Sequence, residues 1–249
     1  MNLLALDTGT EFLSIALRTD GAEGTRVVEH HSEGGAKAST DLIAAILQML
    51  ADTGLGLGQL DAICFGSGPG SFTGLRTACS VVQGLAFGAG VPVLAVDSLL
   101  AVAEDARFRT APDASTLQVT ALLDARMDEM YMAQYRYALG RWQTLQASTL
   151  LRPQDLAVPG VEAGVPHLLA GNVFTVYADR LPAQALQSAQ VVQALPMAAA
   201  MLRLAPAMLA AGLAVDAALA MPSYIRDKVA KTTAEREAEK AAAQAVATP

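Results

Sequence analysis

The stretch Gly66-Ser-Gly-Pro-Gly-Ser-Phe-Thr-Gly-Leu-Arg76 decides the fold, because the apolar run before it ends in glycines and helical periodicity follows it. It predicts a strand, a tight loop and a helix. Three glycines and one proline within five residues suit a backbone that needs positive φ and close approach, and Ser71 and Thr73 can cap the helix. A phosphate or carboxylate could sit at this helix start, with Arg76 as second donor, although a loop that merely turns the chain is the simpler interpretation.

The loop matches neither of two common nucleotide motifs. It lacks the Gly-Lys-Ser/Thr ending of a P-loop, and Ser71 stands where a dinucleotide fingerprint has its third glycine. The loop alone therefore does not identify a nucleotide site.

The composition describes a folded, acidic protein. Of 249 residues, 53% are apolar, which is ample for one large or two medium domains. The formal net charge of −7 gives no general attraction to nucleic acid or anionic lipid. Cys64 and Cys79 are interpreted as small core residues of a cytoplasmic protein. We expect no signal peptide, and we interpret the apolar run 204–221 as a buried helix and not as a membrane span.

A strand, an Asp-bearing turn and a second strand occur twice along the chain. The first copy begins with Leu3-Leu-Ala-Leu-Asp-Thr-Gly-Thr10 and the second with Val119-Thr-Ala-Leu-Leu-Asp124. Asp7 and Asp124 occupy the same place in the two units, although the second turn has lost its glycine. The repeat predicts an α/β protein of two duplicated lobes, each a mixed sheet flanked by helices.

The remaining pattern fills in these lobes. The other predicted elements are a strand near 26–29, helices at 40–52, 72–89 and 99–106, strands at 91–96 and 167–171, a helix at 197–219 kinked or broken at Pro206, and an extended segment at 222–226. We expect an N-terminal lobe at 1–108, a C-terminal lobe at 109–222 and an extension at 223–249 that is largely tail.

The turns of the two units and the glycine loop form a candidate pocket. Its candidate residues are Asp7, Thr8, Gly9, Thr10, Gly68, Gly70 and Asp124. An Asp-Thr-Gly-Thr turn after a strand is the phosphate-loop form of actin-like ATPases, but it also serves as an ordinary tight turn or an aspartic-protease loop. A protease would need a second such loop, which Asp124-Ala-Arg does not supply. The adjacent His30 and His31 point to opposite faces of a strand and could hardly share one metal ion.

Four motifs in order resemble those of the TsaB (YeaZ) family of bacterial tRNA threonylcarbamoyladenosine biosynthesis proteins. They are Leu-Ala-Leu-Asp-Thr-Gly-Thr-Glu11, Gly66-x-Gly-Pro-Gly-Ser-Phe-Thr-Gly-Leu-Arg76, Leu123-Asp-Ala-Arg-Met-Asp-Glu-Met-Tyr131 and Pro222-x-Tyr-Ile-Arg226. The resemblance covers the chain up to about residue 230. It implies an actin-like two-lobe fold and a non-catalytic scaffold that binds and activates the related TsaD, together with the ATPase TsaE.

The same resemblance bears on metal, cofactor and nucleic acid. The catalytic relative carries a His-x-x-x-His metal site, and Ser98 and Val102 stand at those two positions here, so neither a metal nor a cofactor is expected. Contact with tRNA is expected only through the partner, because the chain is acidic. The alternative is an actin-like transferase or glycoprotease-like peptidase that is active on its own.

The predicted helices 40–52 and 72–89 have surfaces that suggest contact with another subunit, because the first is apolar over a wide arc and the second has a face without bulky side chains. Apolar side chains of helix 40–52 cover an arc of roughly 160°, wider than the ~100° of a core-facing helix. The predicted partner interface consists of Ile43, Ile46, Leu47, Leu50, Thr73, Thr77, Ser80 and Gly84. We expect these helices to pack against the matching pair of a related subunit, or against a second copy when that partner is absent. Alternatively, the small residues pack under loops of the same lobe.

Overall fold

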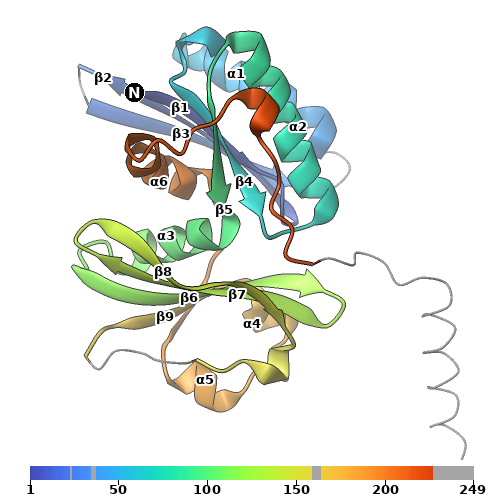
Figure 1. Ribbon diagram of the computed structural model, residues 1–249, viewed down its shortest axis with the longest axis vertical. Coiled ribbons are helices and arrows are strands. Elements are labelled where there is room, and N and C mark those ends of the chain that lie inside the picture. Colours follow the sequence, from blue (N-terminus) through green and yellow to red (C-terminus); the bar gives the residue numbers. More distant parts are fainter. Residues whose placement is uncertain (23, 35–37, 159–163, 227–249) are drawn as a thin grey trace, which may run out of the picture.

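The computed structural model of this protein describes residues 1–22, 24–34, 38–158 and 164–226. It has two lobes, drawn one above the other in Figure 1, and each contains one five-stranded sheet. In both sheets antiparallel and parallel pairs occur together. The predicted duplicated α/β fold with mixed sheets flanked by helices is confirmed.

The first sheet has the strand order β3-β2-β1-β4-β5. Its strands are β1 (Asn2–Asp7), β2 (Phe12–Gly21), β3 (Gly24–Glu33), β4 (Ala62–Gly68) and β5 (Val93–Asp97). The strands β1, β2 and β3 form an antiparallel meander, and β4 and β5 extend the sheet in parallel on the other side of β1. The weak strand pattern near 26–29 is thus part of a longer edge strand.

The second sheet repeats this topology in the order β10-β9-β6-β7-β8. Its strands are β6 (Thr116–Arg126), β7 (Glu129–Ala138), β8 (Arg141–Leu151), β9 (His167–Gly171) and β10 (Gln190–Gln193). Here β6 takes the central place of β1, with an antiparallel meander on one side and parallel strands on the other. The repeat in the sequence is therefore a repeat of a whole sheet.

Helices cover the sheets in layers (Figure 1). The α-helices are α1 (Ala38–Thr53), α2 (Phe72–Ala89), α3 (Ser98–Thr110), α4 (Val173–Val176), α5 (Ala183–Gln187) and α6 (Ala198–Ala210), and the short 3₁₀ helices are η1 (Leu57–Gln59), η2 (Pro153–Asp155) and η3 (Ala217–Leu219). The helices α1 and α2 pack on the outer face of the first sheet. Between the two sheets lie α3 and α6, and α4 and α5 contribute to the outer layer of the second lobe.

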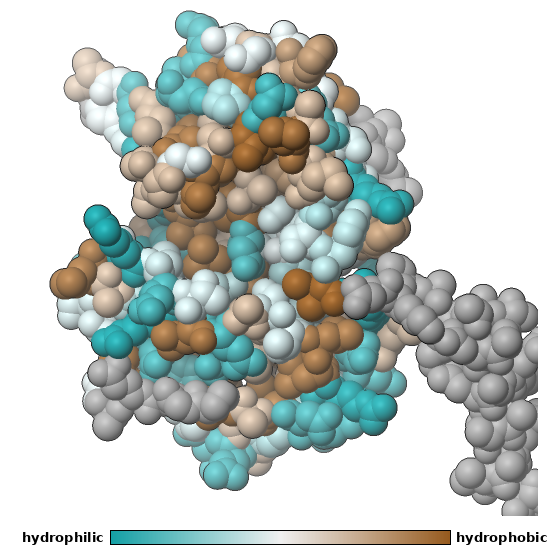
Figure 2. Space-filling view, in the orientation of Figure 1, coloured by the Kyte–Doolittle hydropathy of each residue, from teal (hydrophilic) through white to brown (hydrophobic). Residues whose placement is uncertain are grey.

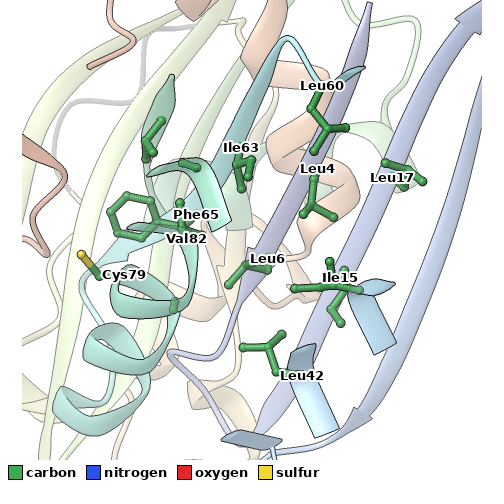
Figure 3. Packing of buried hydrophobic residues seen from close by; sticks show 14 of the residues in the cluster. Leu4, Leu6, Ile15, Leu17, Leu42, Leu60, Ile63, Phe65, Cys79 and Val82 are labelled. Atoms are coloured by element: carbon green, nitrogen blue, oxygen red, sulfur yellow. The ribbon is translucent and has the colours of Figure 1, made fainter. Parts of the chain in front are cut away.

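The core follows from the two-residue period of the strands. In β1, Leu4 and Leu6 face α1 and α2, whereas Leu3 and Ala5 face α6. Figure 3 shows Leu42 of α1 in the same cluster as Leu6 and Leu4. A strand buried on both faces reads as a continuous apolar run, which is why β1 and β4 are apparent in the sequence.

The C-terminal third departs from prediction. The expected helix 197–219 ends at Ala210, and the chain turns through Gly212, whose φ is +71°. The following segment pairs with the edge of β5 at Val93 and packs on α2. It carries the exposed apolar side chains of Leu213 and Met221. Figure 2 shows apolar side chains gathered on the surface of the first lobe.

The position of α6 also modifies the predicted lobes. Residues 198–210 were expected in the C-terminal lobe, yet α6 packs on the inner face of the first sheet. The chain therefore returns to its first lobe after completing the second sheet. Of the predicted extension 223–249, residues 227–249 lie outside the described part.

Candidate functional site

All four sequence motifs meet at one cleft between the lobes. The cleft has a volume of about 730 Å³ and is lined by residues from the β1–β2 turn, the start of α2, the β6–β7 hairpin and the segment 223–226. Of the candidate pocket, Thr8, Gly9, Thr10, Gly70 and Asp124 line this cleft. Segments that lie more than 200 residues apart in the sequence thus form a single site.

The glycine loop packs directly on the first Asp-bearing turn. The Ser71 amide donates to the Gly9 carbonyl at 2.7 Å, and Thr8 Oγ1 donates to the Gly74 carbonyl at 2.7 Å. A Cβ on Gly74 would lie 1.8 Å from the Thr8 carbonyl oxygen, and one on Gly70 would lie 2.9 Å from that of Gly9. These glycines are needed because two backbones touch there.

The helix cap and the positive φ of the loop are found where the sequence placed them. Ser71 caps α2, since its Oγ accepts a hydrogen bond from the Gly74 amide at 3.1 Å. Gly68 has a φ of +123°. Arg76, the expected second donor to an anion, does not line the cleft. Its guanidinium lies 3.6 Å from the centre of the Phe72 ring, and its Nε donates to the Tyr224 hydroxyl.

Asp7 lies behind the cleft and not in its lining. Its side chain is 1% exposed, and Oδ1 accepts a hydrogen bond from the Gly9 amide at 2.8 Å. Oδ2 accepts from Ser98 Oγ at 3.5 Å, and a Cβ on Gly66 would come within 1.8 Å of it. Burial raises the pKa of Asp7 to about 7, against the smaller lowering effect of the two hydrogen bonds.

Asp124 is the structural counterpart of Asp7. In both turns Oδ1 accepts from the amide two residues later, which for Asp124 is that of Arg126 at 2.8 Å. Unlike Asp7, Asp124 is half-buried at the cleft, and it also accepts a hydrogen bond from the Tyr177 hydroxyl at 2.6 Å. The Asn172 side chain accepts from the Asp124 amide. The predicted equivalence of the two aspartates is confirmed by this shared geometry.

The β6–β7 turn, residues 126–128, has an unusual backbone. Arg126, Met127 and Asp128 have φ values of +58°, +54° and +62°, although none is glycine. The left-handed conformation costs such residues roughly 1–2 kcal/mol each. The loss of glycine seen in the sequence therefore leaves a strained turn that neighbouring groups must hold.

Ser98 and Val102, which the resemblance predicts to stand where the catalytic relative has its two metal-binding histidines, both lie in the interior. Ser98 is fully buried, and its Oγ accepts from the Gly68 amide at 3.2 Å. Val102 is fully buried in the core of the second lobe. A hydroxyl and an isopropyl group in these surroundings do not fit a transition-metal site. Across the described ranges, no three His, Cys, Asp or Glu residues are grouped so that they could hold a metal ion.

The histidines take ordinary structural places. His31 lies against Ser14 and Glu29, at 3.3 Å and 3.0 Å, on the exposed side of β3. His30 has the alternate, half-buried position. His167 contacts Thr120 Oγ1 through Nε2 at 3.0 Å, and burial lowers the pKa of its ring.

The predicted partner interface divides into exposed and buried residues. Ile46 and Leu50 are buried in the core of the first lobe, so they are removed from the predicted surface. The wide apolar arc of α1 arises because it includes this core-facing stripe. Ile43 and Leu47 remain 45% and 49% exposed.

On α2 the small residues, of which Thr73, Ser80 and Gly84 are exposed and Thr77 is half-buried, continue into an aromatic side chain that the sequence analysis missed. Phe87 is 81% exposed. We call the surface formed by these side chains the α1–α2 face; it consists of Ile43, Leu47, Thr73, Thr77, Ser80, Gly84 and Phe87. The five α2 positions follow one another at intervals of four, three, four and three residues, the period of a coiled-coil seam. This period is the signal that could have revealed Phe87.

No helix in the part of the chain that the structure describes is both long enough and apolar enough to traverse a bilayer. The suspect run 204–221 is divided between α6, a turn and η3.

Comparison with known proteins agrees with the fold and the motifs. The family model "TsaD: tRNA N6-adenosine threonylcarbamoyltransferase" matches residues 29–234. The TsaB protein of Escherichia coli is 33% identical over 92% of this chain and 96% of its own length. The TsaB protein of Haemophilus influenzae is 43% identical over 54% of this chain and 53% of its own.

A solved structure is similar over nearly its whole length. YeaZ from Pseudomonas aeruginosa superposes with a TM-score of 0.77 and 36% identity, covering 90% of this chain and 99% of that one. Together with the TsaD-type model, this match supports the actin-like class of two-lobe folds. The chain therefore belongs to the TsaB (YeaZ) family.

Proposed function

We propose that this chain is a non-catalytic subunit in tRNA threonylcarbamoyladenosine biosynthesis, where it binds and activates the related catalytic subunit TsaD together with the ATPase TsaE. The role in this modification follows from membership of the TsaB family, whose curated members carry that description. The specific partners and the non-catalytic role are the proposal.

The α1–α2 face is the observation that carries the proposal. Its small α2 residues leave a smooth strip on which another helix can approach closely, and the exposed Leu47 and Phe87 offer apolar anchors. The TsaD family model matches residues 29–234, a range that includes both helices, so a TsaD subunit should carry a matching pair. Two such pairs would form a four-helix contact, and a second copy of this chain could use the same face when the partner is absent.

The interlobe cleft supports a non-catalytic role. The carboxyl group of Asp7 is covered by the glycine loop, and Ser98 and Val102 occupy the two metal-ligand positions of the catalytic relative. The chain thus lacks the ligands that the related enzyme uses, while it keeps the fold that presents α1 and α2.

Charge and thiol chemistry support this proposal. A net charge of −7 disfavours binding of tRNA to this chain alone, so we assign tRNA contact chiefly to the partner. Cys64 and Cys79 are free and buried, which suits the reducing cytoplasm.

Substitutions on the face test the proposal. Ser80→Arg and Thr77→Trp add bulk to the smooth strip and should weaken binding to purified TsaD at least about thirtyfold, the effect of losing a hot-spot contact. Gln143→Arg, on the exposed edge strand β8 of the other lobe, is the matched control and should bind like wild type. Binding is measured by calorimetry and size exclusion, with the circular-dichroism melt as a folding control. Wild-type affinity of both variants would place the interface elsewhere, and unfolding of both would show that the strip belongs to the core.

A further inference from the structure

The segment 222–226 passes from the first lobe to the second (Figure 1), and its residues 223–226 line the cleft. At the first lobe, the Ser223 amide donates to the Ser67 carbonyl of the glycine loop at 2.7 Å. A Cβ on Gly68 would lie 2.4 Å from the Ser223 carbonyl oxygen. The glycine loop is therefore shaped to receive this segment.

The next residue reaches the first turn of α2. The Tyr224 ring packs on Phe72 with 5.1 Å between ring centres, and its hydroxyl accepts from Arg76 Nε at 3.1 Å. Arg76 in turn stacks on Phe72, so the three side chains form one aromatic and cationic cluster. The start of α2 is thereby tied to the crossing segment.

The last two residues bind the second lobe. Ile225 packs against its core. Arg226 donates from Nη2 to Glu129 Oε2 and to the Arg126 carbonyl, and its Nη1 lies 3.3 Å from Met127 Sδ. These contacts hold the strained β6–β7 turn from both ends.

We infer that the segment 222–226 is a clasp that holds the mouth of the cleft at one width, and that Arg226 is the positioning residue that anchors it. The lobes are already joined at the centre by α3, where Asp97 accepts from the Tyr135 hydroxyl at 3.0 Å. The clasp acts at the opposite, open edge. It couples the β6–β7 turn of one lobe to the first turn of α2 in the other. This inference rests on intramolecular contacts alone and does not depend on the proposed function.

Two truncations separate the clasp from the residues that follow it. A chain ending at Arg226 keeps every contact described above and should exchange backbone hydrogens like the full chain. A chain ending at Met221 loses them, and hydrogen–deuterium exchange should accelerate about tenfold in peptides covering both 71–76 and 126–131, as expected when charge-assisted hydrogen bonds are lost. Unchanged exchange in either peptide would overturn the inference.

A point variant keeps the test decisive if the shorter chain fails to fold. Arg226→Met retains the length of the side chain but removes its donors, and Arg141→Met at an exposed position of β8 is the control. With Arg226→Met, exchange should accelerate at 126–131 and also at 71–76, which Arg226 does not touch. Faster hydrogen exchange at 126–131 alone would show that Arg226 stabilises only the β6–β7 turn, and it would refute the clasp. Arg141→Met should leave both peptides unchanged.

Discussion

Asp7→Asn should remove a pH dependence from the stability of this protein. The Asp7 carboxyl is buried, receives hydrogen bonds from the Gly9 amide and Ser98, and has a pKa raised to about 7 by desolvation. A carboxyl group whose pKa is higher in the folded state than in the unfolded state binds its proton more tightly in the folded state. The contribution of protonated Asp7 to the free energy of unfolding is therefore complete below pH 3.8 and is lost as the pH rises to about 7.

The magnitude follows from the two pKa values. A rise of about three units corresponds to roughly 4 kcal/mol over the whole range, at 1.36 kcal/mol for each unit. Between pH 5 and pH 8.5 the linkage relation leaves a loss of about 2.5 kcal/mol in the free energy of unfolding of wild type. Asparagine keeps the acceptor for the Gly9 amide but does not ionise. The free energy of unfolding of the Asp7→Asn variant should therefore not fall in this way as the pH rises.

Urea unfolding of both proteins at pH 5 and pH 8.5 measures the effect. The stability difference between variant and wild type should change by about 2.5 kcal/mol in favour of the variant as the pH rises. Asp20→Asn is the control, because Arg18 lowers the pKa of Asp20 and its contribution is lost only as the pH falls below this window. A wild-type to Asp7→Asn difference that stays constant within about 0.5 kcal/mol would refute the reasoning.

Four further substitutions, two of which are controls, test the packing and the ion pairs of the interior. Gly66→Ala should lower the free energy of unfolding by about 3 kcal/mol or prevent folding, because its Cβ would lie 1.8 Å from a buried carboxylate oxygen. Gly84→Ala, with nothing within 4 Å of the added Cβ, should instead raise the free energy of unfolding by about 0.5–1 kcal/mol when both variants are unfolded in urea. Equal effects of the two substitutions would contradict the packing argument. Glu104→Ala should cost about 3–5 kcal/mol in urea unfolding, since this buried carboxylate pairs with Arg107 and accepts two further side-chain hydrogen bonds. Asp52→Ala, at an exposed position, is the control and should lower the free energy of unfolding by under about 0.5 kcal/mol. An equally small effect of Glu104→Ala would show that the buried ion pairs contribute little.

Sequence patterns located the parts of the fold that are buried on two sides or repeated. The duplicated turns identified Asp7 and Asp124 as equivalents, and the glycine loop predicted both the bounds of α2 and its Ser71 cap. The strand β8 (Arg141–Leu151) was missed because it is an edge strand with polar side chains on most exposed positions, which gives little apolar alternation. The end of α6 was missed because a run of alanines and leucines continues past the turn at Gly212.

The site was predicted where contacts are local and missed where they are long-range. The Asp7 turn is visible in four adjacent residues, but the contact of Arg76 with Tyr224 spans 148 positions. Hydrophobic periodicity also could not separate Ile46 from Ile43 on α1. Both belong to one wide apolar arc, and only the position of the sheet decides which side is core.

The return of α6 to the first lobe has a consequence for biosynthesis. The inner face of the first sheet, which includes Leu3 and Ala5, is covered by α6. Its last strand, β5, ends at Asp97, whereas α6 ends at Ala210. At translation rates of about 5–20 residues per second, this face remains without its native cover for roughly 6–23 s while the ribosome completes the second sheet. The first lobe can therefore acquire its full core only after most of the polypeptide has been made.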